Sequence, residues 1–462
     1  MIKSSTLRRP LLALVMCALA GYQGATAQAN DGMFAASEQL FTGTGDERLD
    51  SLKTMMARGN PDMLATIILA LRFGLYDPDA LNWAAAGITG SEGTGWFDWM
   101  LWQESHPEHA AHPSYGHFKL ELYKLIDSNF SRFLNDATIA PDKMKIRLEE
   151  ITWGGVKVDG IPSLDNPAFL AADDAEYLRD TDLVFGVNIN GDARAYPLRI
   201  MGWHEMFNDV IGGVPVALAY CTLCGAGILY ETSNIDGQDK PFTFGSSGFL
   251  YRSNKLMFDR QTDSLWNQFT GAPVVGALVD SGITLKTRPV VITNWQDWRT
   301  ANPTTKVLSL NTGYRRDYGS GVVYNSYFNS DNLMFPALVD QSRLAQKEYV
   351  FGIRQPLSAK AWPLKSFVDT PVINDRIGAT PVVLVGQAGT RTVRAFARGD
   401  RQFTRGTNPG ALRDENGQIW HMSEAALSGP QGQSAPRVAG HVSYWFAWDS
   451  YLGVRSDLYQ AP

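Results

Sequence analysis

The stretch GGVPVALAYCTLCG, residues 212–225, decides the class of fold expected for most of this chain. Residues 214–220 form a short apolar run, which follows a Gly-Gly pair and precedes a compact Cys-x-x-Cys-Gly segment. An apolar run between turn residues predicts a strand, and residues 228–230 (ILY) are then the returning strand. The two cysteines are therefore expected at a strand–turn–strand corner.

An internal repeat extends the β-rich prediction towards the C-terminus. Residues 185–220 align without a gap on residues 351–386, at a constant offset of 351 − 185 = 166. The matches include AYPL at 195–198 with AWPL at 361–364, and ND at 208–209 with ND at 374–375. We interpret the repeat as two copies of one β-rich module, at residues 149–312 and 340–462.

Residues 28–148 are expected to form a helical N-terminal region. Asn60-Pro61 is a typical helix start, the apolar residues of 64–71 follow at helical spacing, and Gly74 is a suitable stop. Further helices are predicted over 48–58 and 118–134. The predicted fold class is α+β, with a helical N-terminal region followed by two duplicated β-rich modules.

Residues 1–27 have the pattern of a secretory signal peptide. Lys3, Arg8 and Arg9 precede a short apolar stretch at 11–20, and Ala-Thr-Ala at 25–27 fits a cleavage site. The apolar stretch is much shorter than the roughly 20 residues that span a bilayer. We therefore predict a periplasmic or secreted protein with no transmembrane segment in the mature chain.

Composition narrows the functional classes. The formal net charge is −6 and no basic block occurs, so binding to nucleic acid is not expected. Cys17 would leave with the signal peptide, so that Cys221 and Cys224 would be the cysteines of the mature chain. One short Cys-x-x-Cys loop adds little stability to a chain of this size, and this favours a chemical role.

The first interpretation of the Cys-x-x-Cys-Gly pattern is a metal site. Its sulfurs point to one side of a knuckle turn, and His204 is the natural third ligand. Two thiolates and one imidazole suit copper(I), or zinc with an open position. The repeat aligns His204 with Thr370 and Cys221 with Gln387, so the fold itself does not require them. Met257 could add a thioether ligand, but it aligns with Leu412 and packing is an equal explanation.

Two alternatives remain open. The first is thiol–disulfide chemistry, although redox Cys-x-x-Cys pairs usually open a helix and this pair is predicted between strands. The second is a structural Cys221–Cys224 disulfide in a non-catalytic binding module, with His204 as an ordinary buried histidine.

Glu205 is a candidate acid–base group. Asp259, Arg260 and Arg252 could form a polar cluster near the site, with a structural role favoured for Asp259. A histidine cluster is interpreted as a solvated loop: His106, His109, His112 and His117.

Several motifs together resemble a known prokaryotic family. They are DGIP at 159–162, AYPL at 195–198, HE at 204–205, ND at 208–209, YCTLCG at 220–225, and DR at 259–260 followed by SLW at 264–266. This set is similar to the family called "domain of unknown function 3179", well over 150–310 and loosely over the later copy. Thr222 departs from the family, which often has proline there. The resemblance implies a fold family and the same His204, Cys221 and Cys224 set, and it names no reaction.

The functional prediction is an exported metal-binding protein that uses a Cys2His site, with copper favoured over zinc, in a redox or metal-handling role. The alternatives are a thiol–disulfide redox protein and a binding module with a structural disulfide. The sequence specifies neither a substrate nor a partner.

Overall fold

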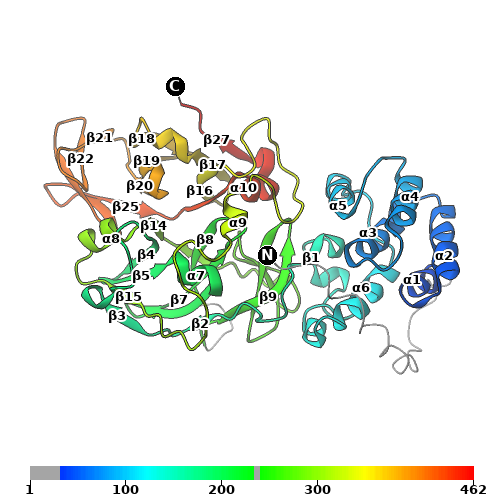
Figure 1. Cartoon of the computed structure of the whole chain (residues 1–462). Helices are drawn as coiled ribbons and strands as arrows, with labels where there is room; N and C mark the ends of the chain where they lie inside the picture. Colours follow the sequence, from blue (N-terminus) through cyan, green and yellow to red (C-terminus); the bar gives the residue numbers. More distant parts are fainter. Residues whose placement is uncertain (1–31, 234–239, 462) are drawn as a thin grey trace.

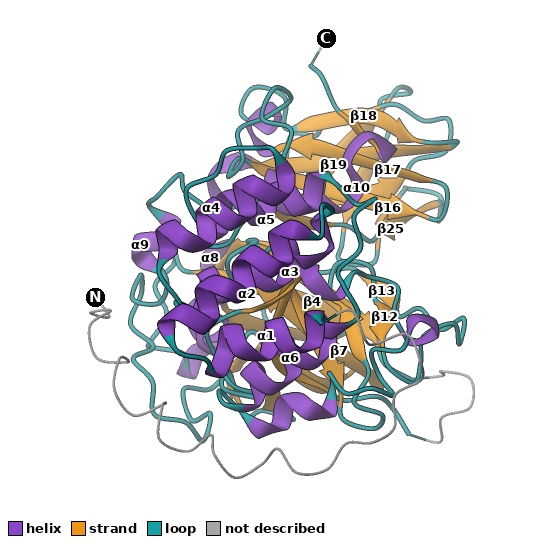
Figure 2. Ribbon diagram, turned by 90° about the vertical axis from the view of Figure 1, so that its right-hand side faces the viewer, coloured by secondary structure: helices purple, strands orange, loops and turns teal. Residues whose placement is uncertain are grey.

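The computed structural model describes residues 32–233 and 240–461, and its architecture is α+β. Helices form residues 33–132 and several β-sheets follow, which confirms the predicted order (Figure 1). Viewed from the helical side, helices α1–α6 lie together in front of the sheets (Figure 2). The predicted signal peptide lies outside the described residues. Within the described ranges, no helix is both long and apolar enough to cross a membrane.

The N-terminal region is built of short helices whose ends carry clear capping signals. Thr44 Oγ1 accepts a hydrogen bond from the Glu47 N–H, and the Glu47 carboxylate accepts one from the Thr44 N–H, so a capping box starts α2. Asn60 caps the predicted helix start, and Gly74 ends α3 with a left-handed φ of 60°. The helices are α1 (Met33–Thr42), α2 (Gly45–Ala57), α3 (Leu64–Phe73), α4 (Pro78–Thr89), α5 (Trp96–Ser105) and α6 (Ser114–Lys124).

The helix predicted over 118–134 is wrong at both ends. Helix α6 starts four residues earlier and ends at Lys124, and a separate 3-10 helix follows at Ser128–Arg132. Asp127 causes the break because its side chain accepts the Asn129 N–H and caps the second helix. Phe130 and Phe133 are buried beyond the break. The apolar spacing therefore indicated which side chains are buried. It did not indicate where the helix ends, because burial continues beyond the break.

The first β-rich segment contains three five-stranded sheets. One has the order β14-β4-β5-β15-β3, another β13-β8-β7-β6-β2, and the third β1-β9-β10-β11-β12. The elements of this segment are β1 (Ile151–Trp153), β2 (Leu164–Asp165), β3 (Phe169–Ala171), β4 (Leu183–Ile189), β5 (Asp192–Pro197), α7 (Leu198–His204), β6 (Met206–Ile211), β7 (Val214–Cys221), β8 (Ala226–Glu231), β9 (Phe244–Tyr251), β10 (Asn254–Asp259), β11 (Leu265–Asn267), β12 (Ala272–Val275), β13 (Lys286–Arg288), β14 (Val291–Asn294), α8 (Trp295–Ala301) and β15 (Lys306–Leu308).

The second β-rich segment contains a four-stranded sheet, β26-β16-β17-β27, and an eight-stranded sheet that begins β18-β19-β20-β25. Its main elements are β16 (Tyr349–Gln355), β17 (Ser358–Pro363), β18 (Val372–Ile377), β19 (Thr380–Gln387), β20 (Thr392–Ala397), β25 (Ser434–Val438), β26 (His441–Tyr444), α10 (Trp445–Leu452) and β27 (Ser456–Leu458).

Strand pairing in the two segments corresponds at the sequence offset of the repeat. Val184 lies opposite Pro197 in the β4–β5 pair, and Val350 lies opposite Pro363 in the β16–β17 pair, so both positions shift by 166 (350 − 184 and 363 − 197). The β6–β7 and β18–β19 pairs correspond in the same way. This pairing is what the repeat predicts, and the duplication itself stays a prediction.

The two segments share one hydrophobic core. Phe185 and Leu218 of the first segment belong to the same buried cluster as Phe351 and Leu384 of the second. Because apolar area from both segments is removed from water together, neither sheet system is a separate body. The residues between the segments, 313–348, form a long connection that contains the short helix α9 (Asn325–Phe328) and packs several side chains in the interior, such as Tyr327 and Ala337.

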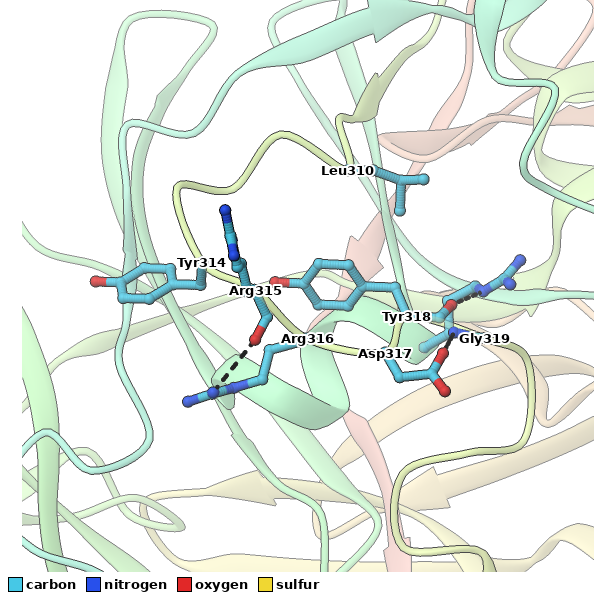
Figure 3. Close-up of a pocket in the computed structure, with 8 residues that line it drawn as sticks. Leu310, Tyr314, Arg315, Arg316, Asp317, Tyr318 and Gly319 are labelled. Carbon is cyan, nitrogen blue, oxygen red and sulfur yellow. Dashed lines mark hydrogen bonds between the residues drawn. The ribbon is translucent and has the colours of Figure 1, made fainter.

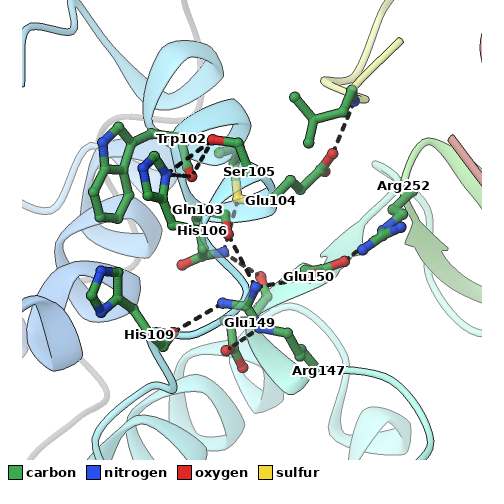
Figure 4. Close-up of polar contacts among 12 residues, drawn as sticks. Trp102, Gln103, Glu104, Ser105, His106, His109, Arg147, Glu149, Glu150 and Arg252 are labelled. Carbon is green, nitrogen blue, oxygen red and sulfur yellow. Dashed lines mark hydrogen bonds and ion pairs between the residues drawn. The ribbon is translucent and has the colours of Figure 1, made fainter. Parts of the chain in front are cut away.

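A buried ionic cluster joins the helical region to the sheets (Figure 4). The Glu150 side chain is fully buried and lies between Arg252 Nε at 2.8 Å and Arg147 Nη1 at 3.1 Å. Arg252 Nη1 also donates to the Ser450 carbonyl at 3.0 Å. Since a buried charge without partners is costly, these contacts fix how the regions meet.

Glu104 of α5 is an acidic side chain at this junction, and its pKa is raised. Its carboxylate accepts the Leu338 N–H at 3.0 Å, and burial raises its pKa to about 8 from an ordinary value of 4.5. The native chain therefore binds more protons than the unfolded chain between these pH values. Stability is expected to fall as the pH rises from about 4.5 to about 8.

Glu104→Gln removes this titration, so the melting temperature of the variant should fall less than that of the wild type between about pH 5 and about pH 8. Thermal unfolding across this range measures the effect. Glu108→Gln, at an exposed neighbour, is the control and should keep the wild-type slope. An unchanged slope in Glu104→Gln would contradict the argument.

Candidate functional site

The two cysteines lie at the corner between β7 and β8, as predicted. Cys221 ends β7, Ala226 starts β8, and the sulfurs of Cys221 and Cys224 form a disulfide with their Cα atoms 5.2 Å apart. The Cys224 N–H donates to the Cys221 carbonyl at 3.2 Å. Gly225 has a φ of 61°, a left-handed conformation that glycine adopts without strain. This confirms the strand–turn–strand arrangement.

The corner is buried under two other parts of the chain. Cys221 is 3% exposed and Cys224 is 0% exposed. The Tyr327 hydroxyl donates to the Leu223 carbonyl at 2.7 Å, and the Tyr444 N–H donates to the Cys224 carbonyl at 2.8 Å. The segment between the β-rich segments and strand β26 therefore both hold the turn in place.

The Glu205 carboxylate lies beside the disulfide turn. Its Oε1 accepts from Thr222 Oγ1 at 2.7 Å and from the Tyr324 hydroxyl at 3.4 Å. Its Oε2 lies 3.2 Å from Lys255 Nζ. Thr222 stands between the two cysteines in the sequence, so one hydrogen bond connects the carboxylate to the turn that carries both sulfurs.

Glu205 reaches this position because of a break in the backbone. It ends α7 in a left-handed conformation with a φ of 55°, which is strained for a residue that is not glycine. Its carbonyl accepts the Tyr220 N–H at 2.8 Å, next to the first β6–β7 pair. A functional site is where such strain is usually retained.

Lys255 and Glu205 form a buried ion pair. Its side chain is 4% exposed and that of Glu205 is 10% exposed, so both charges are nearly removed from water. The negative charge of Glu205, followed by burial, raises the pKa of the Tyr324 hydroxyl, which therefore remains a donor. Separating two such charges from water has a large desolvation cost, and the three hydrogen-bonding partners offset part of it.

Sequence reasoning considered Glu205 but missed Lys255 and Tyr324. The alignment of the copies carries a signal, because Glu205 aligns with Pro371 at the offset of 166. Lys255 aligns with Gly410 when Asp259 is placed on Asp414. A lysine inside the short strand NKLMFD, absent from the other copy, could have been identified as a buried functional cation.

His204 is buried, and both of its ring nitrogens have partners. Nδ1 lies 2.9 Å from the Pro162 carbonyl, which can only accept, so Nδ1 carries the proton. Nε2 lies 2.6 Å from the Tyr318 hydroxyl, and burial lowers the pKa of the ring, which keeps it neutral. In the part of the chain that the structure describes, no group of three or more His, Cys, Asp or Glu side chains is arranged to hold a metal ion. The Cys2His metal site stays a prediction.

The other candidates have structural surroundings. Met257 is fully buried in a cluster with Trp266, and Asp259 accepts the Trp266 indole N–H at 2.8 Å. Asp414 accepts the Trp420 indole N–H in the same way at 3.0 Å, which fits a structural role for this aspartate. Arg260 pairs with Asp159, whereas Arg252 lies in the junction with the helical region, so the expected polar cluster is not assembled.

The histidine cluster is on the loop between α5 and α6 and at the start of α6. His106 stacks on Trp102 with ring centroids 4.0 Å apart, and His109 stacks on the same ring at 5.7 Å. His117 is exposed. His112 is buried and lies 2.9 Å from Ser114 Oγ, so the expectation of a solvated loop is wrong for this residue.

The motif set and the strand arrangement agree with a family match. Residues 158–454 match the family described as "Protein of unknown function (DUF3179)". The chain belongs to this family. The match covers both β-rich segments, including the Cys-x-x-Cys turn, Glu205 and Lys255, and it begins after the helical region. No curated protein and no solved structure matches the chain.

Replacing Lys255 with methionine leaves the Glu205 carboxylate buried without its cation. The expected loss is about 3–5 kcal/mol of unfolding free energy, measured by chemical denaturation. Adding Glu205→Gln removes the unpaired charge and should recover part of this loss. Lys286→Met is the control, because Lys286 pairs with Glu231 at the surface and its side chain is 68% exposed. Equal losses of unfolding free energy in Lys255→Met and Lys286→Met would contradict the argument that the buried Glu205 carboxylate requires its cation.

Proposed function

We propose that Cys221–Cys224 is a reversible redox disulfide and that this chain is an exported thiol–disulfide redox protein. The observation that carries the proposal is the hydrogen bond from Thr222, between the cysteines, to the buried Glu205 carboxylate. Lys255 and Tyr324 hold that carboxylate from two other elements. A carboxylate beside a disulfide turn can accept a proton and pass it on where thiols form.

A purely structural disulfide accounts less well for these surroundings. The bridge joins residues three apart, and the stabilisation from loop closure is smallest for the shortest loops. The Glu205–Lys255 pair and the strained Glu205 backbone each oppose folding by about 1 kcal/mol or more. A turn that needed only a structural disulfide would require neither the buried ion pair nor the strained backbone.

The reaction is an exchange with a dithiol on a partner molecule. A partner thiolate attacks one sulfur, so that the Cys221–Cys224 bond breaks and a mixed disulfide forms. The second partner thiolate then attacks the mixed disulfide. The partner is oxidised to a disulfide, and Cys221 and Cys224 are reduced to thiols that take up the two protons the partner loses. Attack on either sulfur requires movement of the covering segments, because Cys221 is 3% exposed and Cys224 is 0% exposed.

Metal binding is a second candidate, and it applies to the reduced chain. The thiolates of Cys221 and Cys224 become available only when their bond is broken. The Nδ1–H of His204 donates to a backbone carbonyl, which is the partner that metal-binding histidines commonly have on their second nitrogen. Copper(I) or zinc would be held by these three side chains.

Thiol titration in dithiol redox buffers tests the redox proposal. The folded chain is expected to gain two thiols on reduction and to lose them on reoxidation, without unfolding. Cys221→Ser should abolish this cycle. A disulfide that is reduced only when the chain unfolds would overturn the proposal and leave a structural bridge.

Glu205→Gln should slow reduction by a factor of about ten or more near neutral pH, because the carboxylate that would relay a proton is lost. Glu231→Gln is the matched control, since Glu231 is a carboxylate at the end of β8 that pairs with Arg288 away from the turn. Stopped-flow reduction by a dithiol measures both. Equal rates in the two variants would remove Glu205 from the mechanism.

Metal analysis of the reduced chain after incubation with copper(I) or zinc tests the second candidate. Stoichiometric binding that is lost in both Cys221→Ser and His204→Ala would support the Cys2His site. Binding that survives His204→Ala would exclude His204 as a ligand.

A further inference from the structure

The loop that follows β15 lines an open surface cavity beside α7, with a volume of about 700 Å³. Figure 3 shows the residues that line it. Arg199 of α7 lines the cavity together with residues of the loop. The loop residues are Leu310, Tyr314, Arg315, Arg316, Asp317, Tyr318 and Gly319. The proposed redox chemistry uses none of these residues.

Side chains of α7 hold the loop in one conformation. Arg199 Nε donates to the Tyr318 carbonyl at 2.6 Å, and the Trp203 indole N–H donates to the Asp317 carbonyl at 2.8 Å. His204 Nε2 lies 2.6 Å from the Tyr318 hydroxyl. Positions 199, 203 and 204 of one short helix thus bind two adjacent loop residues, so the cavity wall is built before any ligand arrives.

The cavity has an excess of positive charge. Arg199, Arg315 and Arg316 contribute three cations and Asp317 one anion, which gives 3 − 1 = +2 in a chain whose net charge is −6. Arg315 and Arg316 are exposed and, in the described ranges, form no ion pair. Arg316 donates to the Arg315 carbonyl at 3.4 Å, and its guanidinium carbon lies over the Trp203 ring, 5.8 Å from the centroid.

Asp317 does not neutralise these arginines. Its carboxylate accepts the Gly319 N–H at 2.9 Å and shapes the turn of the loop. Arg199 is already paired with Asp182 at 3.0 Å. The two consecutive loop arginines are therefore the cations available to a ligand, and guanidinium groups bind carboxylate and phosphate oxygens in pairs.

Apolar surface lies beside the arginines. Leu310 is 41% exposed and Tyr314 is 45% exposed, and both line the same cavity. Large apolar side chains at this exposure next to unpaired cations suit a ligand with both an anionic and an apolar part.

We propose that this cavity binds a small organic oxyanion, a carboxylate or phosphate ester with an apolar or aromatic group. Arg315 and Arg316 bind the oxyanion, while Leu310 and Tyr314 contact the apolar group. The site is separate from the disulfide turn, so it stands whether or not Cys221–Cys224 is a redox pair.

Calorimetric titration of the full mature chain with phenyl phosphate at low ionic strength tests the site, with benzoate and inorganic phosphate as the other probes. The Arg315→Gln/Arg316→Gln double variant should weaken binding of phenyl phosphate by a factor of about ten or more. Neither side chain packs in the core, so the fold should be retained. Tighter binding of phenyl phosphate than of benzoate would identify a phosphate ester, and the reverse order a carboxylate.

Arg405→Gln/Arg413→Gln is the matched control, because it removes two exposed arginines on the adjacent strands β21 (Phe403–Arg405) and β22 (Ala411–Asp414), and neither residue lines the cavity. It should leave affinity unchanged. Tyr314→Ala should reduce the preference for phenyl phosphate over inorganic phosphate. Absence of saturable binding to the wild type, or an equal loss in both double variants, would overturn the proposal.

Discussion

The Glu205 carboxylate is the point at which separate parts of the site meet. The backbone of Glu205 ends α7. The side chain of Glu205 accepts hydrogen bonds from the disulfide turn and from Tyr324, and it pairs with Lys255 of β10. Each of these elements is fixed elsewhere by ordinary sheet or core contacts. A buried charge tolerates little displacement of its partners, because each lost contact exposes an uncompensated desolvation cost. The carboxylate therefore sets the relative positions of helix, turn and strand.

The site belongs to the first β-rich segment, but the second segment completes its surroundings. The Tyr444 N–H at the end of β26 donates to the Cys224 carbonyl, and the Tyr444 hydroxyl accepts a hydrogen bond from Tyr349 of β16 at 2.9 Å. A Cβ on Gly225 would come within 2.8 Å of the Tyr349 ring. Similar strand pairing thus serves two purposes: one segment carries the cysteines and the other presses aromatic side chains against them.

Local signals in the sequence predicted the local structure well. The Gly-Gly turn, the β7 strand and the cysteine corner needed only neighbouring residues, and so did the helix start at Asn60 and the stop at Gly74. The break after Lys124 was missed because the capping role of Asp127 interrupts a pattern that remains apolar. The division that the repeat suggests, between residues of the fold and residues of the site, stays a prediction.

Contacts between residues that are far apart in the sequence could not be predicted in the same way. Lys255 lies 50 positions from Glu205 and Tyr324 lies 119 positions away, and only the packed sheets bring them together. The surroundings of His204 could not be predicted either. Its neighbour Glu205 faces the cysteine turn, whereas the ring of His204 is held by Pro162 and Tyr318. One left-handed residue at the end of α7 separates the two side chains, and no spacing rule reveals it.

The segment over the disulfide also touches the helical region, and this has a consequence for how the chain responds as a whole. Ala337 packs in the cluster around Cys221 and Cys224, and the next residue, Leu338, donates its N–H to Glu104 of α5. If a partner that binds the helices displaced α5, it would act on the backbone that covers the sulfurs, and the coupling between the two sites would be reciprocal.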